Sequence, residues 1–343
     1  MDSMSFFLSK RPQIKRLLIN MSYKLYKAHS FFYPNLREKI LSYPLKVSFP
    51  RIVHPENINI CNSKCVMCPY PLMTRKKGLM SNKLYKKIVD ECVQHNEFRE
   101  LWLYMFGEPL LDKDIFKKIM YAKRKGVPIV FLSTNASVLD ENKAKKMIES
   151  GLDSIVVSLD GTKKTTYERL RQGLNFDEVT TNIKTLISLK KKMGKNTPKV
   201  TLQIIKMNDT KAEIKSFIKK WENLADTISV VPCHDYAGQR KGKANWVAST
   251  EKRLPCDYLW DKCTILHDGR VVFCCMDYDG RIIVGDINKE SIEKVWDGNK
   301  MQSLRKLHIE GKFNKIPLCS ECNIYLNLDK DNIAKSYIDY LKQ

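Results

Sequence analysis

Three cysteines with close spacing are the residues of this sequence most able to do chemistry. Cys61, Cys65 and Cys68 form the pattern Cys-x-x-x-Cys-x-x-Cys. Three thiolates so close together can hold one metal centre, and the neighbouring sequence offers no fourth protein ligand. Because a structural zinc site is normally closed by four ligands, this pattern leaves one coordination position for a group that is not protein.

The spacing resembles that of radical S-adenosylmethionine (SAM) enzymes, whose [4Fe-4S] cluster keeps one iron free to bind SAM. The family commonly has an aromatic residue before the third cysteine, whereas this chain has Met67. Gly107, Glu108 and Pro109 resemble the Gly-Gly-Glu-Pro element that holds the SAM amino group, with Phe106 in place of the first glycine.

Other polar residues resemble the family's SAM contacts at the ends of strands. The resemblance implies that Arg171 faces the SAM carboxylate and that Gln203 lies near the ribose. The remaining residues that it implies around SAM are Ser133, Asn135 and Ser158.

Composition and charge limit the function classes. The chain has 343 residues, 43% of them hydrophobic, which suffices for one large core and a smaller one. No apolar run approaches membrane-spanning length, and Lys10 and Arg11 interrupt any secretory segment, so we expect a cytoplasmic protein. In that compartment eleven cysteines indicate thiolate ligands rather than disulfides.

A net charge of +22 could attract an anionic partner, but the lysines are scattered and form no compact basic-aromatic motif. We therefore expect no specific nucleic-acid partner. Residues 1–50 form a basic N-terminal extension in which Ile14, Leu17, Leu18 and Met21 give an amphipathic helical pattern. Such a helix could lie on an anionic membrane surface or pack against the rest of the protein.

The elements that must position these residues alternate between strands and helices. Strands are predicted at 58–60, 101–106, 127–132, 155–157, 200–205 and 228–231. Helical patterns lie between them, for example near 140–150, 177–192 and 210–222. Repeated strand-helix units predict parallel strands joined by right-handed crossovers. We expect an α/β fold in which residues 51–232 form a partial (β/α)6 TIM-like barrel, with the site at the carboxyl ends of its strands.

A second set of cysteines follows a predicted linker at 233–255. A hairpin from Thr264 to Phe273, turning at Asp268 and Gly269, leads to Cys274 and Cys275. A single helical segment is predicted at 291–309. The layout of 256–343 resembles the small twitch or SPASM extensions of radical SAM enzymes. The resemblance implies one auxiliary [4Fe-4S] cluster, with the ligands Cys256, Cys274, Cys319 and Cys322.

Spacing leaves alternatives open for this second set. Cys263 could replace Cys256, and Cys275 could replace Cys274, because spacing does not tell which sulfur points inward. Zinc could also be held by four of these sulfurs.

The resemblance implies that the first cluster, once reduced by a flavodoxin- or ferredoxin-type partner, cleaves SAM to a 5′-deoxyadenosyl radical that removes hydrogen from a substrate. We expect oxidation or epimerisation of a carbinol carbon in a sugar- or cyclitol-like small molecule. The auxiliary cluster would then accept an electron. Asp277 and Asp279 are the first candidates for the catalytic base, and His234 and Asp235 are further ones. The alternatives are a maturase that modifies a peptide or protein, and a non-catalytic iron-sulfur electron carrier.

Overall fold

A computed structural model describes residues 48–240, 253 and 255–322. The chain divides into two compact units, Met1–Ser48 and Phe49–Gln343, and every described residue except Ser48 belongs to the second unit. The amphipathic helix predicted in the N-terminal extension lies outside the described residues. Within the described part of the chain, no helix combines the length and the apolar character needed to cross a membrane.

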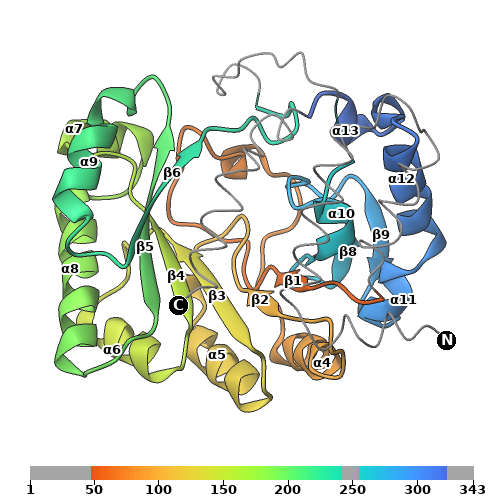
Figure 1. The fold of residues 1–343 in the computed structure, drawn as a ribbon, viewed down its shortest axis with the longest axis horizontal. Coiled ribbons are helices and arrows are strands. Elements are labelled where there is room, and N and C mark those ends of the chain that lie inside the picture. Colours follow the sequence, from red (N-terminus) through yellow and green to blue (C-terminus); the bar gives the residue numbers. More distant parts are fainter. Residues whose placement is uncertain (1–47, 241–252, 254, 323–343) are drawn as a thin grey trace, which may run out of the picture. The chain divides into compact units, whose positions relative to one another are not determined.

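A nine-stranded sheet forms the framework of the second unit, in the order β6-β5-β4-β3-β2-β1-β7-β8-β9. Figure 1 shows it running from β6 on one side of the molecule, through β1, to β9 on the other. Strands β1 to β6 are all parallel, which confirms the predicted partial barrel. Their bounds are Ile52–Pro55 (β1), Glu100–Trp102 (β2), Ile129–Thr134 (β3), Ser154–Ser158 (β4), Lys199–Lys206 (β5) and Thr227–Pro232 (β6).

Helices connect these strands. The helices near 140–150, 177–192 and 210–222 are present as predicted, the last one as a short 3-10 turn followed by α9. Local capping explains several helix starts: the Ser81 and Asp140 side chains accept hydrogen bonds from the first turns of α4 and α6. The helices are α4 (Asn82–Cys92), α5 (Ile115–Arg124), α6 (Glu141–Glu149), α7 (Lys164–Leu170), α8 (Phe176–Lys192) and α9 (Ile214–Trp221). The 3-10 turns are η1 (Tyr70–Leu72), η2 (Pro109–Leu111), η3 (Lys211–Glu213) and η4 (Phe313–Lys315).

Buried and half-buried residues alternate along the strands, which gives the barrel one face in the core and one more open face. In β3, β4 and β5 every second residue is buried, as with Leu132, Val157 and Leu202. The residues between them are half-buried. Ser133, Ser158 and Gln203 belong to this second set, so they lie on the face opposite the core.

The first strand lies earlier in the chain than predicted. The sequence favoured 58–60, but β1 spans Ile52–Pro55, and Ile58 makes only an isolated bridge to Leu79. The reason is the asparagine at position 59, whose side chain accepts from Gly78 N at 2.6 Å and donates to Lys76 O at 3.0 Å. Side-chain hydrogen bonds to residues 76–78 therefore replace the regular backbone pairing of a strand at this point.

The last third of the chain continues the same sheet. β7 (Lys262–Ile265) pairs in parallel with β1, and β8 (Arg270–Val272) pairs antiparallel with β7. The predicted hairpin is therefore confirmed, and Gly269 supplies the positive φ of +95° that its turn requires. β9 (Ile283–Asp286) completes the sheet.

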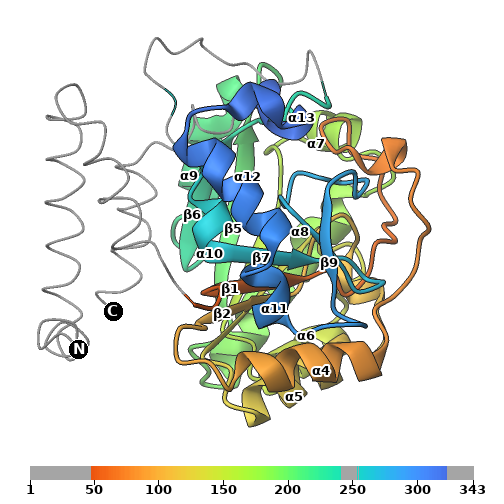
Figure 2. The ribbon, with the colours of Figure 1, turned by 90° about the vertical axis from the view of Figure 1, so that its right-hand side faces the viewer.

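The helical segment predicted at 291–309 is two helices, α11 (Ile292–Trp296) and α12 (Asn299–Ile309). Gly298 has extended backbone angles (φ −67°, ψ 151°) and is the N-cap of α12, which ends one helix and begins the next. Figure 2 shows α11 and α12 on the same side of the molecule as β7 and β9. Two short helices, α10 (Tyr258–Asp261) and α13 (Pro317–Ser320), precede β7 and follow α12.

Candidate functional site

The first three cysteines lie on a loop after β1 that is closed by its own backbone. Cys68 N donates to Cys65 O at 3.1 Å, and Tyr70 N lies 3.4 Å from the Cys68 sulfur. The Tyr70 hydroxyl accepts from Cys61 N at 3.0 Å and from Lys77 Nζ at 3.1 Å. These contacts close the loop, and its thiols are near enough for the charges of Cys65 and Cys61 to raise the pKa of Cys68.

The electrostatics of the three thiols fit a bound cluster. The pKa of Cys61 is raised to about 11 and that of Cys68 to about 12, mainly by burial and in part by the charge of the Cys65 thiolate. Cys65 has two polar neighbours, with its Sγ 3.0 Å from Ser63 Oγ and 3.7 Å from Arg171 Nη1. Buried thiolates that repel one another need a shared cation, which an iron-sulfur cluster supplies.

Gly107 lies where no side chain fits. A Cβ atom at this position would be 2.3 Å from Ile58 O and 3.0 Å from Ile60 O. Its neighbour Glu108 then donates its backbone N–H to Ile60 O at 2.9 Å. The glycine therefore allows the segment after β2 to lie against the strand-like stretch that leads to Cys61.

The Glu108 carboxylate is held by three donors. It accepts from Leu110 N at 3.0 Å, Thr134 Oγ1 at 2.5 Å and Asn135 N at 2.8 Å. Burial raises the pKa of Glu108, while these hydrogen bonds lower it. Thr134 lies between the predicted site residues Ser133 and Asn135, and the predicted Pro109 begins the short 3-10 turn that includes Leu110. The carboxylate is thereby fixed beside β3, where the amino group of SAM is expected.

Two of the remaining predicted SAM residues, Asn135 and Arg171, contact the cysteine loop. Asn135 Nδ2 donates to Asn62 Oδ1 at 3.0 Å, which ties the end of β3 to the cysteine loop. Ser158 and Gln203 are partners in the β4–β5 register. Arg171 is buried and contacts both Asp160 (Nε to Oδ2, 2.8 Å) and the Cys65 sulfur. It therefore lies directly beside the first cysteine set.

Asp279 connects the two cysteine regions. Its carboxylate accepts from Thr74 N and Thr74 Oγ1, both at 2.7 Å, and from Arg75 N at 3.1 Å. Arg75 in turn donates to Tyr278 O at 2.6 Å and pairs with the buried Glu56. Burial raises the pKa of Asp279, but these hydrogen bonds lower it more, so its pKa lies below the ordinary value. The contacts favour a structural role for this carboxylate.

The Asp277 carboxylate also accepts hydrogen bonds from backbone N–H groups. It is fully buried and accepts from Arg281 N at 2.9 Å and Ile282 N at 2.8 Å, so it holds the turn after Cys275. The prediction that Asp277 or Asp279 acts as the catalytic base stays a prediction, and the hydrogen bonds of both carboxylates weigh against it.

The first part of the predicted linker lies across both cysteine regions. Gln239 Nε2 donates to Met276 O at 2.9 Å, and Arg240 donates to Val66 O. Tyr236 has a positive φ of 53°, which is strained for an aromatic residue, and its ring packs against Phe106. Phe106, which departs from the family pattern, also contacts Tyr278, so it fills the space between the two regions.

His234 has a buried nitrogen that accepts no hydrogen bond from the described residues. Its ring packs edge-on against Tyr236 with centroids 4.3 Å apart, and Nδ1 has no partner there. Burial lowers the pKa of His234, so the imidazole is neutral near pH 7. Asp235, the other candidate on this loop, accepts from Gly238 N at 3.0 Å and supports the turn.

The second set of cysteines gathers behind the β7–β8 hairpin. Burial raises the pKa of Cys256, and the charges of Cys322 and Cys275 raise it further. Cys274 and Cys275 hydrogen-bond each other, so both thiols lie in this region. The Cys319 turn repeats the Cys65 turn, with Cys322 N donating to Cys319 O at 3.3 Å.

Cys263 lies elsewhere. It is buried on β7, its charge raises the pKa of Cys92 on α4, and the groups that shift its own pKa are Glu91 and Arg305. For the first alternative, the geometry thus favours Cys256 over Cys263 as a ligand of the auxiliary cluster. For the second, Cys274 and Cys275 lie in the same region, so both fit as the ligand.

The zinc alternative gains no support from the geometry. Among residues 48–240, 253 and 255–322, no three His, Cys, Asp or Glu side chains converge at the spacing of a single metal ion. A zinc ion would need ligands at about 2.0–2.3 Å.

Lys262 was not predicted for the site. It is only 7% exposed, and its ammonium lies 3.9 Å from the centre of the Trp102 ring and 4.3 Å from that of Tyr258. Its charge lowers the pKa of Cys275. The sequence gives no sign of this contact, because a lone lysine in a lysine-rich chain carries no pattern.

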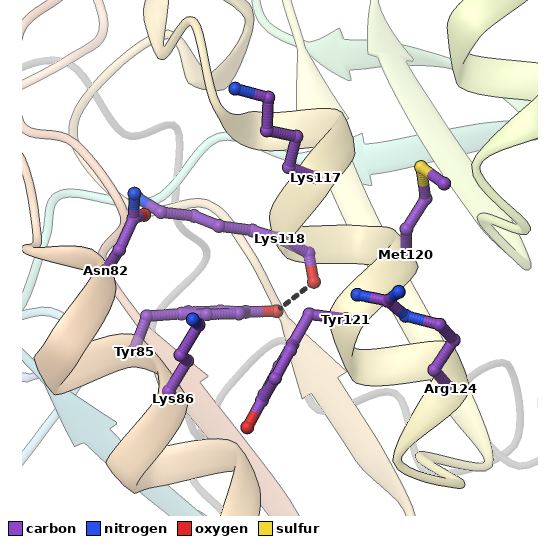
Figure 3. A pocket seen from close by; sticks show the side chains of 8 residues that line it. All are labelled: Asn82, Tyr85, Lys86, Lys117, Lys118, Met120, Tyr121 and Arg124. Atoms are coloured by element: carbon purple, nitrogen blue, oxygen red, sulfur yellow. Dashed lines mark hydrogen bonds between the residues drawn. The ribbon is translucent and has the colours of Figure 1, made fainter.

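A cavity of about 290 Å³ lies outside the barrel, between α4 and α5 (Figure 3). The Tyr85 hydroxyl donates to Lys118 O at 2.9 Å, and Lys86 Nζ lies 5.5 Å from the centre of the Tyr121 ring. None of the predicted site residues lines it, so it is not part of the candidate site. Its lining residues are Asn82, Tyr85, Lys86, Lys117, Lys118, Met120, Tyr121 and Arg124.

Comparisons with known proteins agree with this geometry. Residues 58–220 match the model of the radical SAM superfamily, and residues 256–323 match that of the SPASM iron-sulfur cluster-binding domain. A relative, the S-adenosyl-L-methionine-dependent 2-deoxy-scyllo-inosamine dehydrogenase of Niallia circulans, is 24% identical over 77% of this chain and 88% of its own length. Several further curated relatives match over 26% to 53% of their length.

Solved structures share the fold. The structure of BtrN in complex with AdoMet and 2-DOIA has a TM-score of 0.56 at 18% identity and covers 81% of this chain and 94% of its own. Streptococcus suis SuiB bound to its precursor peptide SuiA has a TM-score of 0.62 at 15% identity and covers 79% and 70%.

The chain therefore belongs to the radical SAM superfamily and carries a C-terminal SPASM-type domain. It is a radical SAM enzyme, and its cofactors are SAM, the SAM-binding [4Fe-4S] cluster and an auxiliary [4Fe-4S] cluster.

Proposed function

We propose that this enzyme oxidises a carbinol carbon of a cyclitol- or sugar-like substrate and passes one electron to the auxiliary cluster. The observation that carries the proposal is the contact between the two cysteine regions, through Asp279 and Gln239. A substrate held there would lie within reach of both clusters. The similar cyclitol dehydrogenase supports the substrate class.

Bound together, the first cluster and SAM supply the radical that takes hydrogen from the substrate carbon. The proposed metal ligands are Cys61, Cys65 and Cys68 for the first cluster, and Cys256, Cys274, Cys319 and Cys322 for the auxiliary one. Glu108 would bind the SAM amino group, and Phe106 and Tyr278 would exclude water from the space between the clusters. A flavodoxin or ferredoxin would supply the first electron.

Oxidation also requires loss of the hydroxyl proton, and we assign this step to His234. Its neutral imidazole has an Nδ1 atom without a partner among the described residues, whereas Asp277 and Asp279 are bound by backbone N–H groups. With its hydrogen on Nε2, the His234 ring would present a free Nδ1 lone pair to the substrate hydroxyl, and we therefore prefer it as the base.

A labelled substrate tests the reaction type. With deuterium on the carbinol carbon of a cyclitol or amino sugar, we expect deuterium in 5′-deoxyadenosine and one carbonyl product for each 5′-deoxyadenosine, measured by mass spectrometry. In solvent D₂O the substrate carbon should gain no deuterium. A product with solvent deuterium and no carbonyl would show epimerisation instead.

Replacement of His234 tests the base. In His234→Asn we expect carbonyl formation to slow on the order of a hundredfold or more, because general-base catalysis contributes that much. The wild-type rate should fall as the pH drops through a value below 6.5, because the pKa of His234 is lowered and protonation removes the base. SAM binding should be unaffected. The control is His95→Asn, on the connection after α4, which should keep the wild-type rate. A wild-type rate in His234→Asn would contradict the assignment.

A second candidate function is modification of a peptide, which the fold shared with SuiB and its bound precursor peptide favours. The same assay separates the two. Cleavage of SAM driven by a peptide, with the peptide changed in mass and no small alcohol accepted, would select this alternative.

A further inference from the structure

One buried histidine, His308, lies between two of the cysteines proposed to hold the auxiliary cluster. It is near the end of α12 and is only 1% exposed. Its Nδ1 atom is 3.3 Å from the backbone N of Cys256, and its Nε2 atom is 3.3 Å from the sulfur of Cys319. One imidazole thus contacts residues from both ends of the proposed ligand set.

The hydrogen-bond partners decide where the imidazole carries its proton. A backbone N–H can only donate, so Nδ1 of His308 accepts from Cys256 and has no hydrogen of its own. An imidazolium carries a hydrogen on both ring nitrogens, so an Nδ1 that accepts a hydrogen bond also requires a neutral ring. The single proton is then on Nε2, and it is directed at the sulfur of Cys319.

The ring and the sulfur are both held in place. The His308 ring lies between Phe273 and Phe313, with centroid distances of 6.0 Å and 5.1 Å. Arg253 Nη1 donates to Cys319 O at 2.6 Å, and its guanidinium lies 4.3 Å from the centre of the Phe313 ring. The donor and acceptor therefore keep a fixed geometry.

We propose that His308 is a positioning residue for the auxiliary cluster, whose hydrogen bond to the Cys319 sulfur raises the reduction potential of that cluster. A donor to a cluster thiolate withdraws negative charge and stabilises the reduced form, which carries one more electron. The cluster then accepts the electron of the substrate more readily. The hydrogen bond and its effect on the potential rest on the proposed ligand set, and only the benefit for substrate oxidation rests on the proposed function.

The test measures the reduction potential of the auxiliary cluster alone. In full-length protein with Cys61, Cys65 and Cys68 replaced by alanine, about four irons should remain, and an EPR-monitored redox titration reports only the auxiliary cluster. We expect a more negative potential in His308→Leu. His308→Gln should lie closer to the parent, because its amide can still donate. His95→Gln, on the connection after α4, is the matched control and should leave the potential unchanged.

Each result decides the matter. An unchanged potential in His308→Leu with all its iron would overturn the proposal. Loss of iron from His308→Gln would overturn it in favour of direct ligation by the imidazole.

A second measurement needs no variant of His308, in case His308→Leu does not fold. With ¹⁵N-labelled histidine in the same three-alanine protein, pulsed EPR of the reduced cluster should show a weak nitrogen coupling, as expected across a hydrogen bond. No coupling, or the strong coupling of a nitrogen bound to iron, would overturn the proposal.

These measurements use no substrate, so they are independent of which alcohol the enzyme oxidises. If the proposed dehydrogenase activity fails while the potential shifts as expected, the role of His308 stands. A three-alanine protein without any iron would contradict the auxiliary ligand set itself.

Discussion

Replacement of Cys61, Cys65 and Cys68 together by alanine is expected to abolish SAM cleavage and to leave about half of the iron. The reason is that these three thiols lie on one loop, affect one another's pKa and are the proposed ligands of the SAM-binding cluster. Wild-type protein reconstituted without oxygen should hold about eight irons, and the variant about four. Iron analysis and chromatography of 5′-deoxyadenosine measure both quantities.

Cys92→Ala is the control for this experiment. Cys92 is fully buried on α4, and its pKa is affected by Cys263 rather than by either proposed ligand set. Its replacement should leave both the iron content and the SAM cleavage unchanged. SAM cleavage at the wild-type rate in the variant without the three cysteines would contradict the assignment of the first cluster.

Cys322→Ala is expected to separate SAM cleavage from oxidation. The first cluster keeps all its ligands, so 5′-deoxyadenosine still forms when substrate is present. The oxidised product should disappear, because the substrate radical has lost its electron acceptor. Comparing 5′-deoxyadenosine with the carbonyl product, both by mass spectrometry, should show a ratio near one in the wild type and a large excess of 5′-deoxyadenosine in the variant.

Cys263→Ala provides the comparison here, because Cys263 lies on β7 near Glu91 and Arg305, away from the proposed auxiliary ligands. It should behave as the wild type. Continued carbonyl formation by Cys322→Ala at the wild-type rate would mean that the auxiliary cluster does not take the electron.

The parallel barrel could be predicted because its information is local. Strands such as β4 and β5 are short runs rich in β-branched residues, and amphipathic helices such as α8 and α9 follow them in the chain. Parallel neighbours then bring their carboxyl ends together, which places Ser158 beside Gln203 without any knowledge of side-chain contacts.

Prediction failed where a local pattern competes with side-chain hydrogen bonds or backbone conformation. Ile58 and Ile60 have the apolar alternation of a strand. The hydrogen bonds of the Asn59 side chain to Lys76 and Gly78 replace regular strand pairing there. The periodicity of α11 and α12 continues across Gly298, yet the extended backbone of this glycine separates the two helices.

Contacts between distant residues could not be predicted at all. His308 meets Cys256 from 52 positions away, and Arg75 reaches Tyr278 from 203. Thr134 binds Glu108 from 26 positions away. Such pairs depend on three-dimensional packing, and a single sequence contains no record of it.

The parallel pairing of β7 with β1 has a consequence for dividing this protein. Four residue pairs, from Ile52 with Lys262 to Pro55 with Ile265, join the first strand of the barrel to the first strand of the SPASM-type region. A gene fragment ending near residue 240 would keep the pairing of β1 with β2 but would expose the other edge of β1, which pairs with β7 in the full chain. We therefore expect such a fragment to aggregate during expression, and co-expression of the two halves to recover more protein than either half alone.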